Sequence, residues 1–94
     1  MRIEEFRQSI NNGAMPAGIG IYLQAMWLDA NGKWSDAHNL IDSLENKTAY
    51  AVHAYLHRKE GDKWNANYWY NKAGTAMPLN SLEEEWEEIV KMLL

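Results

Sequence analysis

Residues 53–70 read HAYLHRKEGDKWNANYWY, and this segment carries the clearest signals for the fold. Gly61 follows a run of helix-forming residues, and glycine readily adopts the left-handed conformation that ends a helix. Asp62 comes next, with a side chain suited to capping the start of another helix. Four aromatic residues then fall within positions 64–70. The segment therefore predicts two helices joined by a tight corner at Gly61 and Asp62.

A weaker copy of this arrangement lies upstream, between residues 24 and 41. An offset of 29 residues aligns the small residues of the copies, whereas an offset of 30 aligns Trp34 with Trp64. Because the two offsets compete, the two corners are expected to differ in geometry. The repeat predicts two antiparallel helical hairpins, with the first alanine of each copy at a close contact between helices. The aligned small residues are Ala25 with Ala54, Gly32 with Gly61, and Ala37 with Ala66.

The whole chain, residues 1–94, is predicted to be one all-α domain of about six helices without strands. Gly13 is expected to end the first helix, and Pro16 to begin the second. Within the second helix, Gly18 and Gly20 are expected to permit close approach of a neighbouring helix. The expected helices are Ile3 to Ile10, Pro16 to Ala30, Trp34 to Leu44, a cap at Asn46 or Thr48 through to Glu60, Asp62 to Ala73, and Leu82 to Leu93 after a capping box at Ser81 and Glu84.

Composition favours a chain with a well-packed core. Apolar residues make up 47% of the 94, and five tryptophans and five tyrosines are among them. There is no cysteine, which excludes disulfides and thiolate zinc sites. The first residues lack the apolar core of a signal peptide, and the longest apolar run, Ala14 to Leu28, is too short and too broken to span a bilayer. The protein is therefore expected to be cytoplasmic.

The net charge of −4 comes entirely from residues 81–94, which contain five glutamates and one lysine. Residues 1–80 contain eight basic and eight acidic side chains and are balanced. An acidic last helix on a neutral body argues against a nucleic-acid partner and against an anionic membrane. The glutamates themselves are expected to form a solvated face whose negative charge suits the start of a helix.

The order of small residue, glycine, aromatic and alanine in both copies resembles the tetratricopeptide repeat, over roughly residues 18–78. In the second copy, Ala73 and Pro78 also match that pattern. The period departs from it, because the tetratricopeptide repeat takes about 34 residues. The resemblance implies stacked hairpins with capping helices at both ends of the chain. More loosely, residues 53–74 look like a short bacterial family of uncharacterised proteins, which implies a shared fold and no known activity.

In tetratricopeptide-like stacks the first helix of each hairpin lines a concave groove. That resemblance implies a site for a partner's peptide or helix, in which tyrosine and methionine supply apolar contact and two cations bind an acidic or carboxylate-ended peptide. The alternative is that these cations only complement the dipole at a helix end. The predicted function is non-enzymatic protein or peptide binding, with no cofactor. The predicted peptide-binding residues are Tyr22, Met26, Tyr55, Arg58 and Lys59.

Histidines supply an alternative function. His53 and His57 are four residues apart on one helix, and His38 on the preceding helix could join them. Such a cluster would suit a small metal-assisted or acid–base enzyme, with Asp36 or Asp62 orienting the base. The chain lacks a His-Glu-x-x-His motif and any nucleophile in a recognisable context. We therefore predict no metal and no catalytic residue, and interpret His57 as a buried, hydrogen-bonded side chain.

The aromatic residues of the fifth helix have two interpretations. They could stack nucleic-acid bases or hold a ligand, but four aromatics within seven positions cannot all face one way on a helix. The favoured interpretation is that this helix is buried on two sides between its neighbours. A homo-oligomer remains a third possibility, through either the acidic last helix or the apolar second helix.

Overall fold

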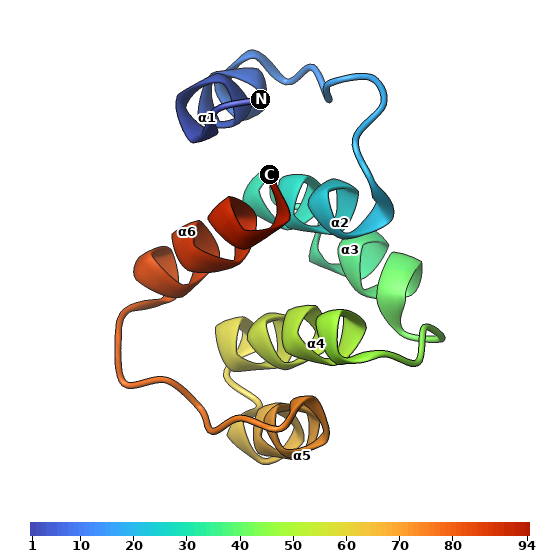
Figure 1. The fold of residues 1–94 in the computed structure, drawn as a ribbon, viewed down its shortest axis with the longest axis vertical. Coiled ribbons are helices and arrows are strands. Elements are labelled where there is room, and N and C mark those ends of the chain that lie inside the picture. Colours follow the sequence, from blue (N-terminus) through green and yellow to red (C-terminus); the bar gives the residue numbers. More distant parts are fainter.

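The computed structural model describes residues 1–94 and contains six helices and no strand (Figure 1). This confirms the predicted all-α fold. The helices are α1 (Ile3–Asn12), α2 (Ile21–Ala30), α3 (Trp34–Ile41), α4 (Lys47–Glu60), α5 (Lys63–Ala73) and α6 (Leu82–Leu93). None of them is long and apolar enough to cross a lipid bilayer.

Two antiparallel hairpins, α2 with α3 and α4 with α5, make up the body of the molecule. Both corners contain a glycine in the left-handed region, Gly32 at φ 80° and Gly61 at φ 89°. The first corner takes residues 31–33, whereas the second takes only residues 61–62. The first helices of the two hairpins therefore end 30 residues apart, at Ala30 and Glu60. The second helices begin 29 residues apart, at Trp34 and Lys63. The first corner is therefore one residue longer than the second, which confirms that the two corners differ.

The small residues lie at the helix crossings, as predicted. Ala25 and Ala54 are fully buried in the first helices of the two hairpins, and so are Ala37 and Ala66 in the second helices. A methyl group at these positions lets two helix backbones approach more closely than a larger side chain would permit. Ala37 and Ala66 occupy equivalent places, each as the fourth residue of its helix, whereas Ala25 and Ala54 differ by one residue in their distance from the helix end.

The core lies between the hairpins and the two terminal helices. Its main cluster holds thirteen buried residues from every helix except α5. A smaller cluster of Ala54, Ala66 and Tyr70 fastens α5 to α4. Helix α6 crosses both α2 and α4, and the indole Nε1 of Trp86 donates a hydrogen bond of 3.3 Å to the carbonyl oxygen of Met26. The last helix therefore covers the side formed by the first helices of both hairpins.

The predicted start of the second helix was wrong. Helix α2 begins at Ile21 instead of Pro16, and residues 14–20 form an irregular connection. Gly18 has φ 78°, which a right-handed helix does not permit, and a Cβ at Gly18 or Gly20 would meet no atom within 4 Å. These glycines therefore mark a loop and no close helix contact. Helix α3 also ends earlier than predicted, at Ile41, where a turn closes through the Leu44 amide and the Ile41 carbonyl.

The prediction that the fifth helix is buried on two sides was also wrong. Helix α5 is the last layer of the stack and packs against α4 (Figure 1). Tyr70 points inward and is 3% exposed, whereas Trp64 and Tyr68 are 80% and 48% exposed. Because successive residues on a helix turn by about 100°, the aromatic run divides between a buried and a solvated face.

Candidate functional sites

The five predicted peptide-binding residues lie on α2 and α4, but they do not form one open groove. Met26 and Tyr55 are 0% and 2% exposed, because α6 packs over this side of α2 and α4. The Tyr22 hydroxyl accepts a hydrogen bond of 2.6 Å from Asn46, at the start of α4. Lys59 lies near the other end of that helix, about 20 Å away at 1.5 Å per residue. The structure therefore separates Tyr22 from Lys59.

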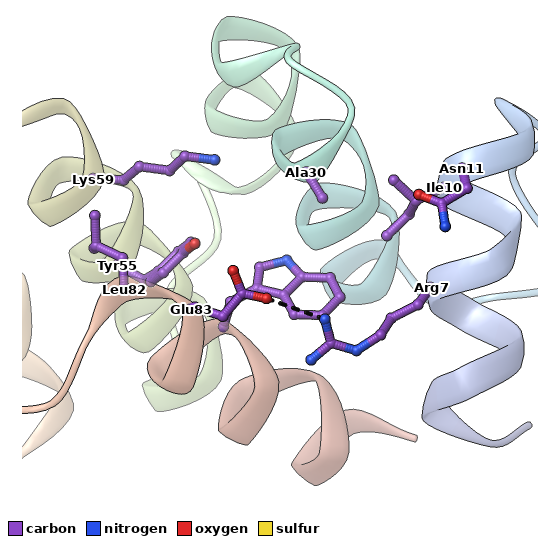
Figure 2. A pocket seen from close by; sticks show the side chains of 9 residues that line it. Arg7, Ile10, Asn11, Ala30, Tyr55, Lys59, Leu82 and Glu83 are labelled. Carbon is purple, nitrogen blue, oxygen red and sulfur yellow. Dashed lines mark hydrogen bonds and ion pairs between the residues drawn. The ribbon is translucent and has the colours of Figure 1, made fainter.

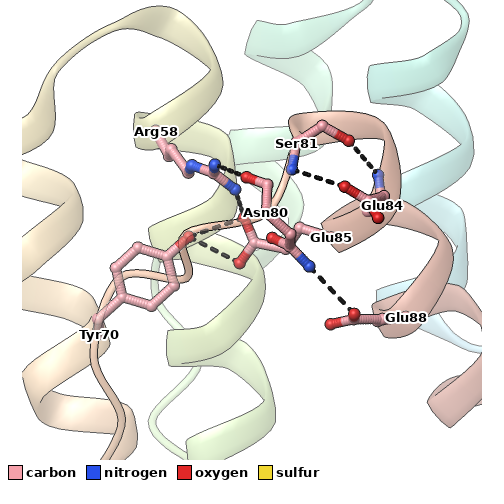
Figure 3. Close-up of polar contacts among 7 residues, drawn as sticks. All are labelled: Arg58, Tyr70, Asn80, Ser81, Glu84, Glu85 and Glu88. Atoms are coloured by element: carbon pink, nitrogen blue, oxygen red, sulfur yellow. Dashed lines mark hydrogen bonds and ion pairs between the residues drawn. The ribbon is translucent and has the colours of Figure 1, made fainter.

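Arg58 binds within the molecule (Figure 3). Its guanidinium donates a hydrogen bond of 2.8 Å to Glu85 Oε1 and another to the carbonyl oxygen of Asn80. Tyr70 donates its hydroxyl to both carboxylate oxygens of Glu85, at 2.9 and 2.7 Å. Burial and the accepting Glu85 carboxylate raise the pKa of Tyr70. These contacts tie α4, α5 and α6 together.

The prediction that the glutamates of the last helix form a solvated face is wrong for Glu85, which is only 6% exposed. The sequence contains a signal for this burial. Glu85 follows Leu82 by three residues and precedes Ile89 by four, so it lies on the apolar stripe of α6 beside Trp86. A carboxylate on that stripe must enter the core, where Arg58 and Tyr70 satisfy its oxygens.

Lys59 forms the second internal ion pair of α4. Its Nζ lies 3.0 Å from Asp29 Oδ2, at the end of α2, and Asp29 is 2% exposed. Burial raises the pKa of Asp29, and the Lys59 ammonium partly offsets this effect. The Lys59 side chain is itself 37% exposed, so its charge also reaches solvent.

A cavity of about 380 Å³ opens where α1, α2, α4 and α6 meet (Figure 2). Arg7 and Asn11 from α1 face Tyr55 and Lys59 from α4 across it. The guanidinium of Arg7 pairs with Glu83 on α6 at 3.2 Å. Two predicted binding residues, Tyr55 and Lys59, thus line a real cavity, together with residues of α1 and α6 that were not predicted. The lining consists of Arg7, Ile10, Asn11, Ala30, Tyr55, Lys59, Leu82, Glu83 and Trp86.

Three histidines come together on the opposite side of α4. One ring nitrogen of each of His38, His53 and His57 lies within 4.8 Å of the others, and His38 Nε2 is 3.0 Å from His53 Nε2. His53 and His57 are two residues from Tyr55 and Lys59, about 200° around the helix, so the cluster and the cavity use opposite faces. The cluster therefore joins α3 to α4 across the two hairpins.

Aromatic rings and carboxylates surround this cluster. The Trp69 ring stacks on His53 with centroids 3.9 Å apart, and Trp34 stacks on His38 at 5.0 Å. His57 Nδ1 lies 2.7 Å from Glu60 Oε1, which confirms that His57, 6% exposed, is buried and hydrogen-bonded. Burial lowers the pKa of His53 to about 4, and the neighbouring charges of His38 and His57 act in the same direction.

No protein-family model, curated protein or solved structure matches this chain. Its function must therefore be inferred from the two sites described above.

Proposed function

We propose that this protein is a non-enzymatic binding module that holds a side chain of a partner protein or peptide in the cavity between α1, α2, α4 and α6. The observation that carries the proposal is the cavity itself, because it contains Tyr55 and Lys59 in an opening of about 380 Å³. Binding pockets usually fall between about 300 and 1,000 Å³ and combine an apolar lining with a few polar groups.

The lining has this mixed chemistry. Five of its nine residues are apolar, and the more exposed of these, Ile10, Ala30 and Leu82, offer contact to an apolar side chain. Two cations, Arg7 and Lys59, stand on opposite sides of the opening (Figure 2). Each is paired within the molecule, with Glu83 and with Asp29, but each side chain is 37% exposed and would attract an acidic neighbour of the bound side chain. This charge pattern and the net charge of −4 favour a polypeptide partner over a nucleic acid or an anionic membrane.

The lining also favours binding over catalysis. It contains no serine, threonine, cysteine or histidine, so it offers no paired nucleophile and imidazole base. The rest of the predicted groove is already filled within the molecule. Helix α6 packs over Met26 and hydrogen-bonds Arg58 through Glu85, so the proposal rests on the cavity alone.

The test needs a variant that fills the cavity without breaking an ion pair. Ala30 lines the cavity at the exposed end of α2, so Ala30→Trp places an indole in the opening. Asn71→Trp adds the same group to the exposed face of α5 and is the matched control. Peptides are selected from a displayed library with the wild-type protein, and their dissociation constants are measured by fluorescence anisotropy.

We expect Ala30→Trp to weaken binding by tenfold or more, since about 1.4 kcal/mol of lost contact corresponds to that factor. Asn71→Trp should leave the dissociation constant unchanged. A library that yields no binder, or selected peptides that bind Ala30→Trp as tightly as the wild type, would count against the cavity as the binding site.

A further inference from the structure

We propose that His38, His53 and His57 bind one divalent transition-metal ion of the zinc class, each through one imidazole nitrogen. This site is independent of the cavity, because the histidines face α3 and the cavity lies on the other side of α4. Imidazole is the ligand that Zn²⁺, Cu²⁺ and Ni²⁺ share in proteins, and three histidines with one open position form a common type of zinc site.

The nitrogen spacing fits such an ion closely. Zinc–nitrogen bonds of about 2.0–2.1 Å at tetrahedral angles place the ligand nitrogens about 3.3 Å apart. The nearest pair, His38 Nε2 and His53 Nε2, is separated by 3.0 Å, and all three ligand atoms lie within 4.8 Å of one another. The three nitrogens are therefore close enough together to share one ion once their rings adjust.

A carboxylate orients one of the three rings, and a second carboxylate lies near another. His57 Nδ1 lies 2.7 Å from Glu60 Oε1, and His38 Nδ1 lies 3.9 Å from Asp42 Oδ2. A metal-bound histidine commonly donates its other ring N–H to a carboxylate, which fixes the tautomer and leaves the remaining nitrogen free to coordinate. Glu60 therefore holds a proton on Nδ1 of His57 and directs its Nε2 to the ion, whereas Asp42 lies beyond direct hydrogen-bond distance of His38.

Neighbouring tryptophans fix the orientation of two histidine rings, and one histidine is partly exposed to solvent. Trp69 stacks on His53 with an interplanar angle of 15°, and Trp34 stacks on His38 at 13°. His53 and His57 are buried, whereas the His38 side chain is 22% exposed. The fourth coordination position would therefore open beside His38, where water or a small ligand could enter.

Zinc binding is measured by isothermal titration on protein purified without a polyhistidine tag. Co²⁺ serves as a second probe, because its visible absorption reports a tetrahedral environment. We expect one Zn²⁺ per chain with a dissociation constant of about 1 µM or tighter. Circular dichroism of each metal-free variant checks that it is folded.

Three variants, with a fourth in reserve, separate the site from adventitious binding. His38→Phe keeps an aromatic ring stacked on Trp34 and should weaken zinc binding by about 100-fold. If His38→Phe does not fold, His57→Gln is used in its place. Glu60→Gln removes an orienting charge without removing a ligand, and should cost 10- to 100-fold. Glu45→Gln removes one exposed carboxylate elsewhere and should change nothing.

Two results would overturn the proposal. One is the absence of saturable binding of one ion per chain to the wild-type protein. The other is wild-type affinity in the folded histidine variant, which would place the ion elsewhere on the surface.

Discussion

Glu85 shows how one buried charge organises its neighbours. The carboxylate is 6% exposed and accepts hydrogen bonds from Arg58 and Tyr70, which belong to two other helices (Figure 3). A buried ion pair adds little net stability over an apolar substitute, but removal of one partner leaves the other charge uncompensated. Arg58, whose side chain is 14% exposed, would be that uncompensated charge.

Glu85→Ala is therefore expected to lower the free energy of unfolding by about 3–5 kcal/mol, measured by urea denaturation. Glu83→Ala is the matched control on the same helix. Glu83 pairs with Arg7 at the surface, where its side chain is 77% exposed, and such pairs contribute about 1 kcal/mol or less. Equal losses in the two variants would show that Glu85 does not depend on its buried partners.

The hairpin corners explain why two similar tryptophans have different roles. The corner at residues 31–33 is one residue longer than the corner at 61–62, so Trp34 is the first residue of α3 and Trp64 the second residue of α5. That shift turns the side chain by about 100°. Trp34 packs inward and donates its Nε1–H to the Leu56 carbonyl at 2.7 Å, whereas Trp64 is 80% exposed.

Trp34→Ala is accordingly expected to cost about 2–4 kcal/mol of unfolding free energy, because it removes both packing and a hydrogen bond. Trp64→Ala should change it by less than about 0.5 kcal/mol. Thermal or chemical denaturation of the pair measures the difference. A large loss in Trp64→Ala would mean that the exposed indole packs against something in solution, such as a second copy of the chain.

The molecule as a whole divides into a firmly packed centre and a loosely attached first helix. Helix α4 buries seven residues and contacts α2, α3, α5 and α6. Helix α1 buries only Phe6, and an irregular connection over residues 14–20 leads from it to α2 (Figure 1). Because α1 also supplies three residues of the cavity lining, its opening would widen the proposed binding site.

Amide hydrogen exchange should reveal this division. We expect the amides of α1 to exchange at least tenfold faster than those of α4, since regions with few buried apolar contacts open at lower free energy. A bound peptide should slow the exchange of α1. Equal protection of α1 and α4 in the free protein would contradict the picture of a loosely attached helix.

Local signals in the sequence were enough for the six helices and for most of their ends. Asn46, Asp62 and Ser81 cap α4, α5 and α6 through hydrogen bonds to backbone amides, and Gly13, Gly61 and Gly74 end their helices in the left-handed conformation. These interactions join residues only a few positions apart, so the local sequence determines them. The apolar run from Ala14 to Leu28 predicts a helix throughout, but the low helix propensity of glycine prevails at Gly18 and Gly20, where the chain forms a loop.

Only the tertiary structure decided which helices pack against one another. The contact between Met26 and Trp86 spans 60 positions, the one between Arg58 and Glu85 spans 27, and the one between His38 and His53 spans 15. Hydrophobic burial has no preferred direction, so an apolar stripe on α6 does not specify which helices it will cover. The sequence by itself therefore determined six helices and two hairpins. Packing of α6 over α2 and α4 determined the cavity, and packing of α3 on α4 brought the three histidines together.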